Sequence, residues 1–252
     1  MLSQNSLVCP NKHAFDLSRK GYVRLLKKER ALNDNFYDFS LFSHRRSFIL
    51  AGFYELLHNK ITEILKEQSA KLILDLGCGE GSHLQPILRN LDNCLCIGCD
   101  LAPDGIQMAT DYLDNNYLPI VADTHHLPFK EEAFDAVIDI LSPFIYREVL
   151  RVLKHNGVFI KVSPTSSYLK ELRSLYGLGD YEKEEDVFDN LKKHFSHIHK
   201  ETIERKYPLT QQNYEDLIHM TPLMHYEQSK SLSAIEGITI SLNIYIIRKE
   251  EQ

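Results

Sequence analysis

The chain has 252 residues, of which 43% are apolar and 25% charged, and its formal net charge is −6. No apolar run approaches the roughly 20 residues of a membrane span, no secretory signal pattern opens the chain, and five cysteines do not suggest a disulfide framework. We therefore expect a cytoplasmic globular protein with one large domain and a small appendage.

The N-terminal segment contains half of a familiar metal-binding pattern. Cys9 and His13 stand four positions apart, as in the second half of a small zinc site, and a structural zinc needs four ligands. The eight residues before Cys9 contain neither cysteine nor histidine. We expect residues 1–35 to form a degenerate zinc-finger-like segment with a remnant pair and no bound metal.

Basic residues gather just after this pair. Eight of the 29 lysines and arginines lie between positions 19 and 46. They could bind nucleic acid or simply form a solvated helical face, and charge alone does not separate the two interpretations. From Phe36 to Lys66 the spacing of apolar residues predicts a turn and then a helix, so residues 36–68 are expected to be a helical linker.

From about Ser69 onward, short apolar runs alternate with amphipathic stretches, which predicts βαβ units and a parallel sheet covered on both faces. The tail is expected to add an antiparallel strand, and residues 168–199 are expected to be helical. The predicted strands are Leu72–Leu76, Cys94–Cys99, Leu118–Val121, Phe134–Leu141, Val158–Val162 and Ile238–Ile247, and the predicted helices are Leu84–Leu91, Gly105–Leu113 and Tyr146–Lys154.

A glycine-rich loop follows the first of these strands. The sequence from Asp75 is D-L-G-C-G-E-G, with the G-x-G-x-G spacing of Gly77, Gly79 and Gly81. Glycines there let a ligand approach the backbone, and N–H groups at a helix start can face it. A dinucleotide fingerprint would place its third glycine at position 82, which is serine, so NAD is disfavoured. Asp100 ends the next strand, where an acid can accept both ribose hydroxyls.

Two further segments complete a pattern over about 90 residues. They are D-x-x-x-LPF followed by FDAVI, starting at Asp123, and EVLRVLK-x-x-G, starting at Glu148. Together with the glycine loop and Asp100 they resemble the class I S-adenosylmethionine-dependent methyltransferases. This resemblance implies a Rossmann-like fold with a mostly parallel seven-stranded sheet and an antiparallel C-terminal strand, over residues 69–252. It also implies S-adenosylmethionine as cofactor, with Asp123 facing the adenine amino group.

The resemblance extends beyond this core. CPNKHAFDLSRKGYVRLL, HRRSFILAGFYELL, SSYLKELRSLYG and IHMTPLMHY are similar to segments of the RlmA-type bacterial rRNA (guanine-N1)-methyltransferases. That family implies further cofactor contacts at Tyr54, His83, Leu84 and Tyr168. At the position of Tyr168 the family usually has histidine. The expected cofactor-binding residues are Tyr54, Asp75, Gly77, Gly79, Gly81, His83, Leu84, Asp100, Leu101, Asp123, Thr124 and Tyr168.

The residues after the fourth strand usually face the methyl acceptor in this fold. Here they are Leu141, Ser142, Pro143 and Phe144. Phe144 could stack on a base or cap the core, and we favour the core. Methylation of guanine N1 requires loss of a proton, but the sequence names no base: neither Asp139 nor Ser142 has an evident partner.

Three other clusters favour structural interpretations. Cys94, Cys96 and Cys99 lie on one strand with side chains on both of its faces, so they do not converge on a metal. His194, His197 and His199 fit a solvated surface near a helix-to-strand transition. His125 and His126 precede the LPF turn beside the expected adenine pocket, where contact with the cofactor and simple packing are equally plausible.

Three functions remain to be compared. The first is methylation of guanine N1 in large-subunit rRNA, the second is methylation of a small molecule after loss of the finger, and the third is non-catalytic cofactor binding. The glycine loop with Asp100 and Asp123 argues against the third. The net charge of −6 and the half zinc site weaken the first, and the resemblance across linker and tail favours it. No membrane partner is expected, and the sequence leaves open whether the chain forms a homodimer.

Overall fold

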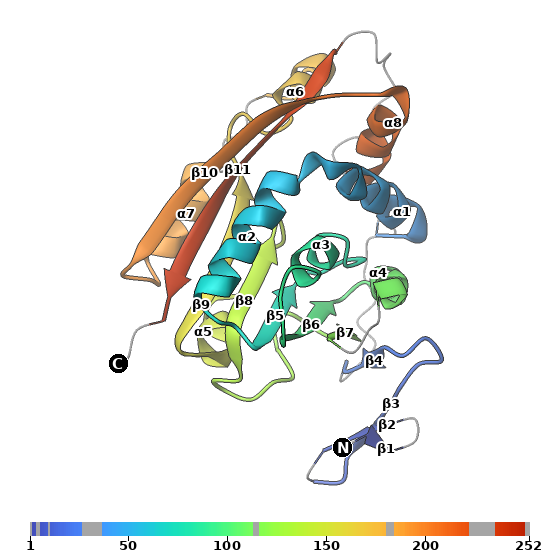
Figure 1. Cartoon of the computed structure of the whole chain (residues 1–252), viewed down its shortest axis with the longest axis vertical. Helices are drawn as coiled ribbons and strands as arrows, with labels where there is room; N and C mark the ends of the chain where they lie inside the picture. The colour runs from blue at the N-terminus through green and yellow to red at the C-terminus, as the bar shows by residue number, and fades with distance from the viewer. Residues whose placement is uncertain are drawn as a thin grey trace.

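The computed structural model describes residues 2–3, 6–9, 11–26, 37–112, 116–179, 184–221 and 235–249. A small N-terminal ribbon lies beside a larger α/β body (Figure 1). The ribbon is a three-stranded antiparallel sheet of β1 (Leu2–Ser3), β2 (Ser6–Val8) and β3 (Ala14–Asp16). Several sequence expectations fall outside the described residues: Lys27, Lys28, Arg30, the helix end at Leu113 and the final part of IHMTPLMHY from Pro222.

The body is built on one twisted sheet. Within the described part of the chain this sheet has eight strands in the order β10-β11-β9-β8-β5-β6-β7-β4, and β11 pairs antiparallel with both of its neighbours. The strands are β4 (Val23–Arg24), β5 (Leu72–Leu76), β6 (Leu95–Asp100), β7 (Tyr117–Val121), β8 (Phe134–Ile140), β9 (Leu153–Pro164), β10 (Ile198–Pro208) and β11 (Gly237–Arg248).

Helices cover both faces of the sheet (Figure 1). Side chains of α2 and α3 join one hydrophobic cluster, and those of α5 and of the end of α7 join the cluster on the other face. The α-helices are α1 (Phe39–Phe48), α2 (Glu55–Glu67), α3 (Leu84–Leu88), α4 (Pro103–Ala109), α5 (Tyr146–Val152), α6 (Lys170–Tyr176), α7 (Glu184–Lys192) and α8 (Gln211–Met220). Short turns of other helix types, η1 (Ile49–Phe53) and η2 (Thr110–Tyr112), follow α1 and α4.

The alternation of side chains along the central strands produces the two clusters. On β5, Ile73 joins the α2 side and Leu74 the α5 side, and both are fully buried. The same alternation separates Cys94 and Cys96 from Cys99, which lies in the opposite cluster. The prediction that these three cysteines face both sides of one strand is therefore confirmed.

The sheet confirms the expected class of fold and corrects its size. Six strands match the predicted runs, and β10 is the seventh strand that the resemblance implied without placing it. Val23 and Arg24 add an eighth, parallel to β7 at Ile120 and Val121. Two residues are too short a run to show a strand period in the sequence. Val23 is nevertheless completely buried, so the N-terminal segment is anchored in the core of the body.

The expected linker helix is two helices separated by a kink. Gly52 has φ +95°, a left-handed conformation that ends the first helical run before α2 begins at Glu55. Helix α1 begins where the Asp38 carboxylate accepts a hydrogen bond from the Leu41 N–H at 2.9 Å. The kink positions Tyr54, the first residue after the turn, at the site described below.

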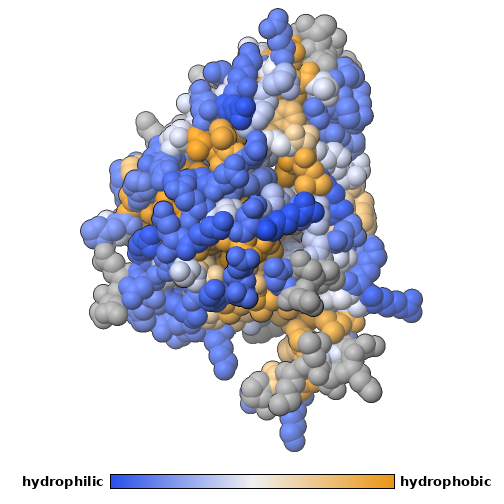
Figure 2. Space-filling view, in the orientation of Figure 1, coloured by the Kyte–Doolittle hydropathy of each residue, from blue (hydrophilic) through white to orange (hydrophobic). Residues whose placement is uncertain are grey.

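The molecular surface in the orientation of Figure 2 is largely hydrophilic, with hydrophobic patches between the charged side chains. In the described part of the chain, no helix has the length and apolar content needed to cross a bilayer. The residues His194, His197 and His199 are exposed around the start of β10, as expected for a solvated surface.

Candidate functional site

The glycine loop between β5 and α3 makes a tight turn that depends on its glycines. Gly77, Gly79 and Gly81 all have positive φ, at +67°, +54° and +80°. The N–H groups of Gly77 and Cys78 both donate to the Cys99 carbonyl, at 2.8 and 3.2 Å, which ties the loop to the end of β6. At Gly77 a Cβ would lie 2.6 Å from the Cβ of Ser142, so no larger residue fits there.

Asp100 fixes the position of this loop. One carboxylate oxygen accepts the Gly79 N–H and the other accepts the Ala102 N–H, both at 2.8 Å. Burial raises the pKa of Asp100, while the Ala102 and Gly79 hydrogen bonds and the charge of Arg45 oppose that rise. The carboxylate therefore shapes the loop and the start of α4.

Three acids mark the carboxyl ends of neighbouring parallel strands. Asp75 lies near the end of β5, Asp100 ends β6, and Asp123 comes two residues after β7. This edge is where open α/β sheets bind their ligands. Burial raises the pKa of Asp75 well above its usual range, and the charges of Asp139 and Asp100 act in the same direction.

Three residues distant in sequence form a cluster beside the loop. The hydroxyl oxygens of Tyr54 and Tyr168 are 2.6 Å apart, and the Tyr54 ring contacts the His83 ring edge-on at 4.8 Å. His83 Nδ1 is in turn 3.0 Å from Nε2 of His58. The structure thus brings together Tyr54, His83 and Tyr168, for which the family resemblance implies cofactor contacts, and adds His58.

The two histidines of this cluster are held neutral. Burial lowers the pKa of His58 to about 4 and that of His83 well below its usual range. In a neutral pair, one ring nitrogen donates and the other accepts. No sequence signal pointed to His58, because a lone histidine on an amphipathic helix is indistinguishable from a surface residue.

Arg45 is a second residue that the sequence analysis did not assign to the site. A Cβ at Gly79 would lie 3.7 Å from an Arg45 Nη atom, so the guanidinium lies beside the glycine loop. Burial raises the pKa of Glu80, Asp100 and Tyr168, and the Arg45 charge opposes that rise. Arg45 packs over the Phe42 ring at 5.4 Å and has no carboxylate partner among the described residues. The neighbouring Arg46 is different: it pairs with Asp111 at 2.6 Å and is occupied in the fold.

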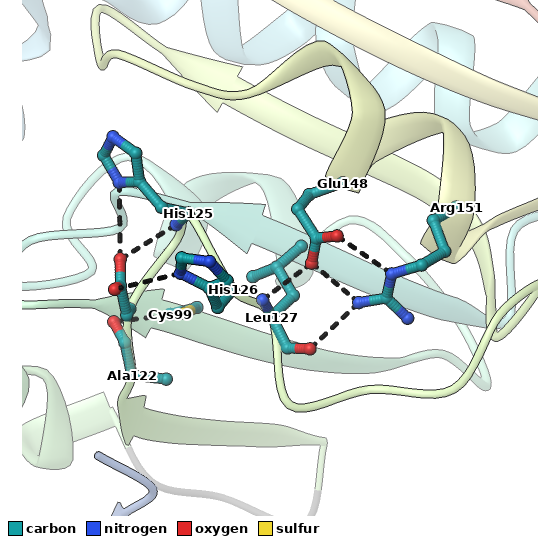
Figure 3. A network of polar contacts seen from close by, with 8 residues as sticks. Cys99, Ala122, His125, His126, Leu127, Glu148 and Arg151 are labelled. Atoms are coloured by element: carbon teal, nitrogen blue, oxygen red, sulfur yellow. Dashed lines mark hydrogen bonds and ion pairs between the residues drawn. The ribbon is translucent and has the colours of Figure 1, made fainter. Parts of the chain in front are cut away.

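Asp123 lies beside His125 and His126, two and three positions further along the chain, and both histidines are labelled in Figure 3. Its carboxylate accepts the His125 N–H at 2.9 Å and lies 3.3 Å from His125 Nδ1 and 3.5 Å from His126 Nδ1. Both rings are exposed, so they border the Asp123 carboxylate on its solvent side. Thr124 and Leu101, which directly follow Asp123 and Asp100, are half-buried.

The EVLR motif holds the turn after Asp123 in place (Figure 3). Glu148 accepts the Leu127 N–H at 2.8 Å, and Arg151 donates to the carbonyls of Leu127 and Phe129 at 2.9 and 2.6 Å. The two side chains also pair with each other at 2.7 Å. This fourth sequence segment therefore positions the third one.

The segment after β8 lies directly against the glycine loop through Ser142 and Gly77. Phe144 packs against Tyr146 at 4.7 Å and Phe159 at 5.1 Å, so its ring caps the core as we expected. Asp139 is completely buried and pairs with Lys161 at 2.5 Å. Because this carboxylate is enclosed, we do not assign Asp139 as a general base, and no other base is identified among the described residues of the site.

Cys9 and His13 lie beside each other at the N-terminal turn. Cys9 Sγ and His13 Nδ1 are 3.5 Å apart across a tight turn, in which Cys9 N–H donates to the His13 carbonyl at 3.0 Å. Among the described residues, no three side chains of histidine, cysteine, aspartate or glutamate converge as metal ligands. Two donors do not fit the four-coordinate zinc that a ribbon of this kind requires.

Comparisons with known proteins agree with this geometry. A family described as a methyltransferase domain matches residues 73–157, and a family described as RlmA, N-terminal, matches residues 1–29. A Bacillus subtilis protein with the provisional name 23S rRNA (guanine-N(1)-)-methyltransferase YxjB is 40% identical over 188 residues. That match covers 68% of this chain but only 62% of the relative, which is less than two thirds of its length.

Two other matches cover more of the chain. The 23S rRNA (guanine(748)-N(1))-methyltransferase of Streptomyces fradiae is 22% identical over 260 residues, 98% of this chain and 92% of its own. A chain from the Haloferax volcanii complex of the Trm112 methyltransferase activator superposes with a TM-score of 0.52 at 16% identity, over 87% of this chain and 100% of its own. At that identity the structural match supports the fold alone.

The sheet order, the glycine loop and the acids at the strand ends define a class I S-adenosylmethionine-dependent methyltransferase. Within that class, the chain belongs to the RlmA-type methyltransferases. The family implies S-adenosylmethionine as methyl donor.

Proposed function

We propose that this protein transfers a methyl group from S-adenosylmethionine to N1 of a guanine in large-subunit rRNA. The observation that carries the proposal is the similarity over 98% of the chain to a Streptomyces fradiae enzyme named for that reaction. The match of residues 1–29 to the RlmA N-terminal family supports it independently, because that segment lies outside the methyltransferase domain. The reaction would take place in the cytoplasm, where rRNA is found.

We propose that the chain has the three parts expected from its sequence. Residues 1–35 form the N-terminal segment, 36–68 the helical linker and 69–252 the methyltransferase domain. The cofactor would be held by Tyr54, Asp75, Gly77, Gly79, Gly81, His83, Leu84, Asp100, Leu101, Asp123, Thr124 and Tyr168.

Each part of this set suits a different part of the cofactor. The spare lone pairs of Asp100 suit the ribose hydroxyls, and the Asp123 carboxylate suits the adenine amino group. Arg45, which has no carboxylate partner among the described residues, suits the carboxylate of the methionine moiety. The backbone of the glycine loop suits the methionine chain that joins the ribose to this carboxylate.

The methyl donor supplies a sulfonium that is already a good leaving group, so the protein needs mainly to position the acceptor. Ser142 and its neighbours lie against the glycine loop and form the boundary between donor and acceptor. Because no base is identified near this boundary among the described residues, we propose that the N1 proton passes to solvent as the bond forms.

The test is methylation of rRNA by the purified full-length chain. Protein is incubated with radiolabelled S-adenosylmethionine and 23S rRNA transcribed in vitro, and the product is examined by primer extension and by mass spectrometry of nucleosides. A methyl group at N1 blocks Watson–Crick pairing, so reverse transcription should stop one nucleotide before the modified guanine. Asp100→Ala should lose incorporation, and Lys60→Met, which removes an ion pair between α2 and β10, is the control.

The outcomes separate the two acceptor classes. Incorporation into rRNA with 1-methylguanosine as product supports the proposal. Binding of S-adenosylhomocysteine with no incorporation into rRNA or ribosomal subunits overturns the rRNA substrate and favours a small-molecule acceptor. The net charge of −6 and the two-donor metal pair are the observations that favour that second candidate.

A further inference from the structure

A buried ion pair lies directly behind the acceptor-facing segment. Lys161 Nζ is 2.5 Å from Asp139 Oδ1, and the two side chains are 7% and 0% exposed. They come from adjacent parallel strands, β9 and β8, whose register places the two residues opposite each other. A buried pair of this kind adds little net stability over two apolar residues of similar size. Its presence therefore calls for another explanation.

Both members of the pair also hold the backbone of Ser142. Lys161 Nζ donates to the Ser142 carbonyl at 2.5 Å, and Asp139 Oδ1 accepts the Ser142 N–H at 3.4 Å. The ammonium also lies 4.9 Å from the centre of the Phe144 ring. The cation and the anion thus bind opposite ends of one residue in the segment that leaves β8.

The chain bends sharply at this point. Leu141 has φ +56°, a left-handed conformation that is strained for a residue other than glycine. Its N–H donates to the Val162 carbonyl at 3.2 Å, so the bend is held from β9 on both sides of Leu141. Strained residues of this kind persist where the surroundings fix them, and they are common at functional sites.

The bend determines which side chains of this segment are exposed and which face the glycine loop or the core. Ser142 is brought against Gly77 in the glycine loop, while Leu141 and Ile145 are left 36% and 37% exposed at the surface. Phe144 turns inward. A shift of Ser142 would therefore move the apolar edge and the wall of the glycine loop together.

We propose that Lys161 and Asp139 are positioning residues that fix the segment Leu141–Ile145 at the donor–acceptor boundary, through the two ends of Ser142. The effect on catalysis rests on the proposed methyl transfer. The clamp itself, by which Lys161 and Asp139 hold the two ends of Ser142, rests on geometry alone. Both side chains are buried, so we assign them no direct contact with cofactor or acceptor. They act through the backbone that the acceptor meets.

A charge reversal separates this role from simple structural pairing. In Asp139→Lys/Lys161→Asp the ion pair is retained, but a carboxylate at 161 cannot donate to the Ser142 carbonyl and an ammonium at 139 cannot accept its N–H. Asp139→Leu/Lys161→Met removes the charges and keeps the volume, in case the reversed pair does not fold. Lys60→Met is the control, because it removes an ion pair with Glu201 that lies 3.0 Å apart on other elements.

Two readouts are needed. The first is hydrogen–deuterium exchange at the amides of Ser142 and Phe144, which requires no substrate. The second is the steady-state rate on rRNA, with KM for the RNA and the affinity for S-adenosylhomocysteine measured separately. We expect exchange at these amides to rise at least about tenfold in both double variants. We also expect kcat to fall about 10- to 100-fold, as for a misplaced reacting group, with S-adenosylhomocysteine affinity within about twofold of wild type.

Unchanged exchange in a folded double variant, or wild-type kcat after the charge reversal, would overturn the proposal. A fall in kcat equal to that of Lys60→Met would do the same. If the wild-type protein does not methylate rRNA at all, the proposed function fails, and the exchange measurement alone decides whether the clamp exists.

Discussion

Replacement of Asp100 tests the centre of the site most directly. Asp100→Ala removes both acceptors of the Gly79 and Ala102 N–H groups, each at 2.8 Å. A hydrogen bond to a charged group contributes roughly 1.5–3 kcal/mol, so the two together could contribute about 3–6 kcal/mol. Burial raises the pKa of this carboxyl and so disfavours its charged form, which reduces the net effect. We expect a loss of about 2–4 kcal/mol in the free energy of unfolding.

A second variant separates shape from charge. Asp100→Asn keeps one acceptor oxygen and places an amide N–H₂ where the other was, so we expect about half the loss of Asp100→Ala. In both variants, affinity for S-adenosylhomocysteine should drop at least about tenfold, because the loop relaxes and the ribose loses its acceptor. Asp104→Ala, in the first turn of α4, is the matched control and should change neither quantity appreciably.

The assay combines urea unfolding followed by far-ultraviolet circular dichroism with titration calorimetry. If Asp100→Ala unfolds at the wild-type urea concentration, the carboxylate does not hold the loop. If stability falls but cofactor affinity is unchanged, Asp100 is structural only and the proposed ribose contact is wrong. The chain contains no tryptophan, so dichroism is preferable to fluorescence.

Three further predictions concern other parts of the molecule. Gly77→Ala should lower the free energy of unfolding by about 2–5 kcal/mol in urea, because a Cβ at this position strains the left-handed backbone and overpacks against Ser142. Adding Ser142→Gly to this variant should recover only the packing part. Full recovery would show that the backbone is not strained. His58 is held neutral with a pKa of about 4, so its stabilisation is complete above its unfolded pKa of about 6.5 and is lost as pH falls toward 4. In His58→Gln, the loss of unfolding free energy between neutral pH and pH 4 should be smaller by up to about 3 kcal/mol. The same dependence of stability on pH as in wild type would count against the burial of His58. Cys9→Ser should change the free energy of unfolding by about 1 kcal/mol or less, with less than one zinc per chain by elemental analysis; one tightly held zinc would contradict this.

The sequence predicted those features that local patterns encode. Continuous apolar runs predicted the buried strands, and glycine spacing with Asp100 predicted the loop that the structure places at the strand ends. β10 was not predicted because its residues are mostly exposed. Apolar and polar residues alternate too weakly in IHKETIERKYP to distinguish an edge strand from a charged helix. The predicted helix over residues 168–199 is instead α6, α7 and the start of β10.

Side-chain partners over long distances could not be predicted. Asp139 and Lys161 are 22 positions apart, and only the parallel register of β8 and β9 places them together. His58 and Arg45 likewise depend on the kink at Gly52, which sets how α1 and α2 approach the loop. The double role of Asp100, as loop support as well as proposed ligand contact, follows from two backbone hydrogen bonds that no sequence pattern specifies.

The attachment of the N-terminal ribbon through β4 has a practical consequence for protein engineering. Val23 and Arg24 cover part of the outer edge of β7, and the bridge from Leu17 to Val23 ties the ribbon to that edge. A truncation designed to remove only the ribbon, cut at residue 29 where its family match ends, would also remove this strand. The shortened protein would expose unpaired backbone groups of β7 and would lose the buried Val23 side chain. Exposed strand edges of this kind promote aggregation. A truncation placed before Leu17 would keep the edge covered, and is the better choice for asking what the ribbon itself does.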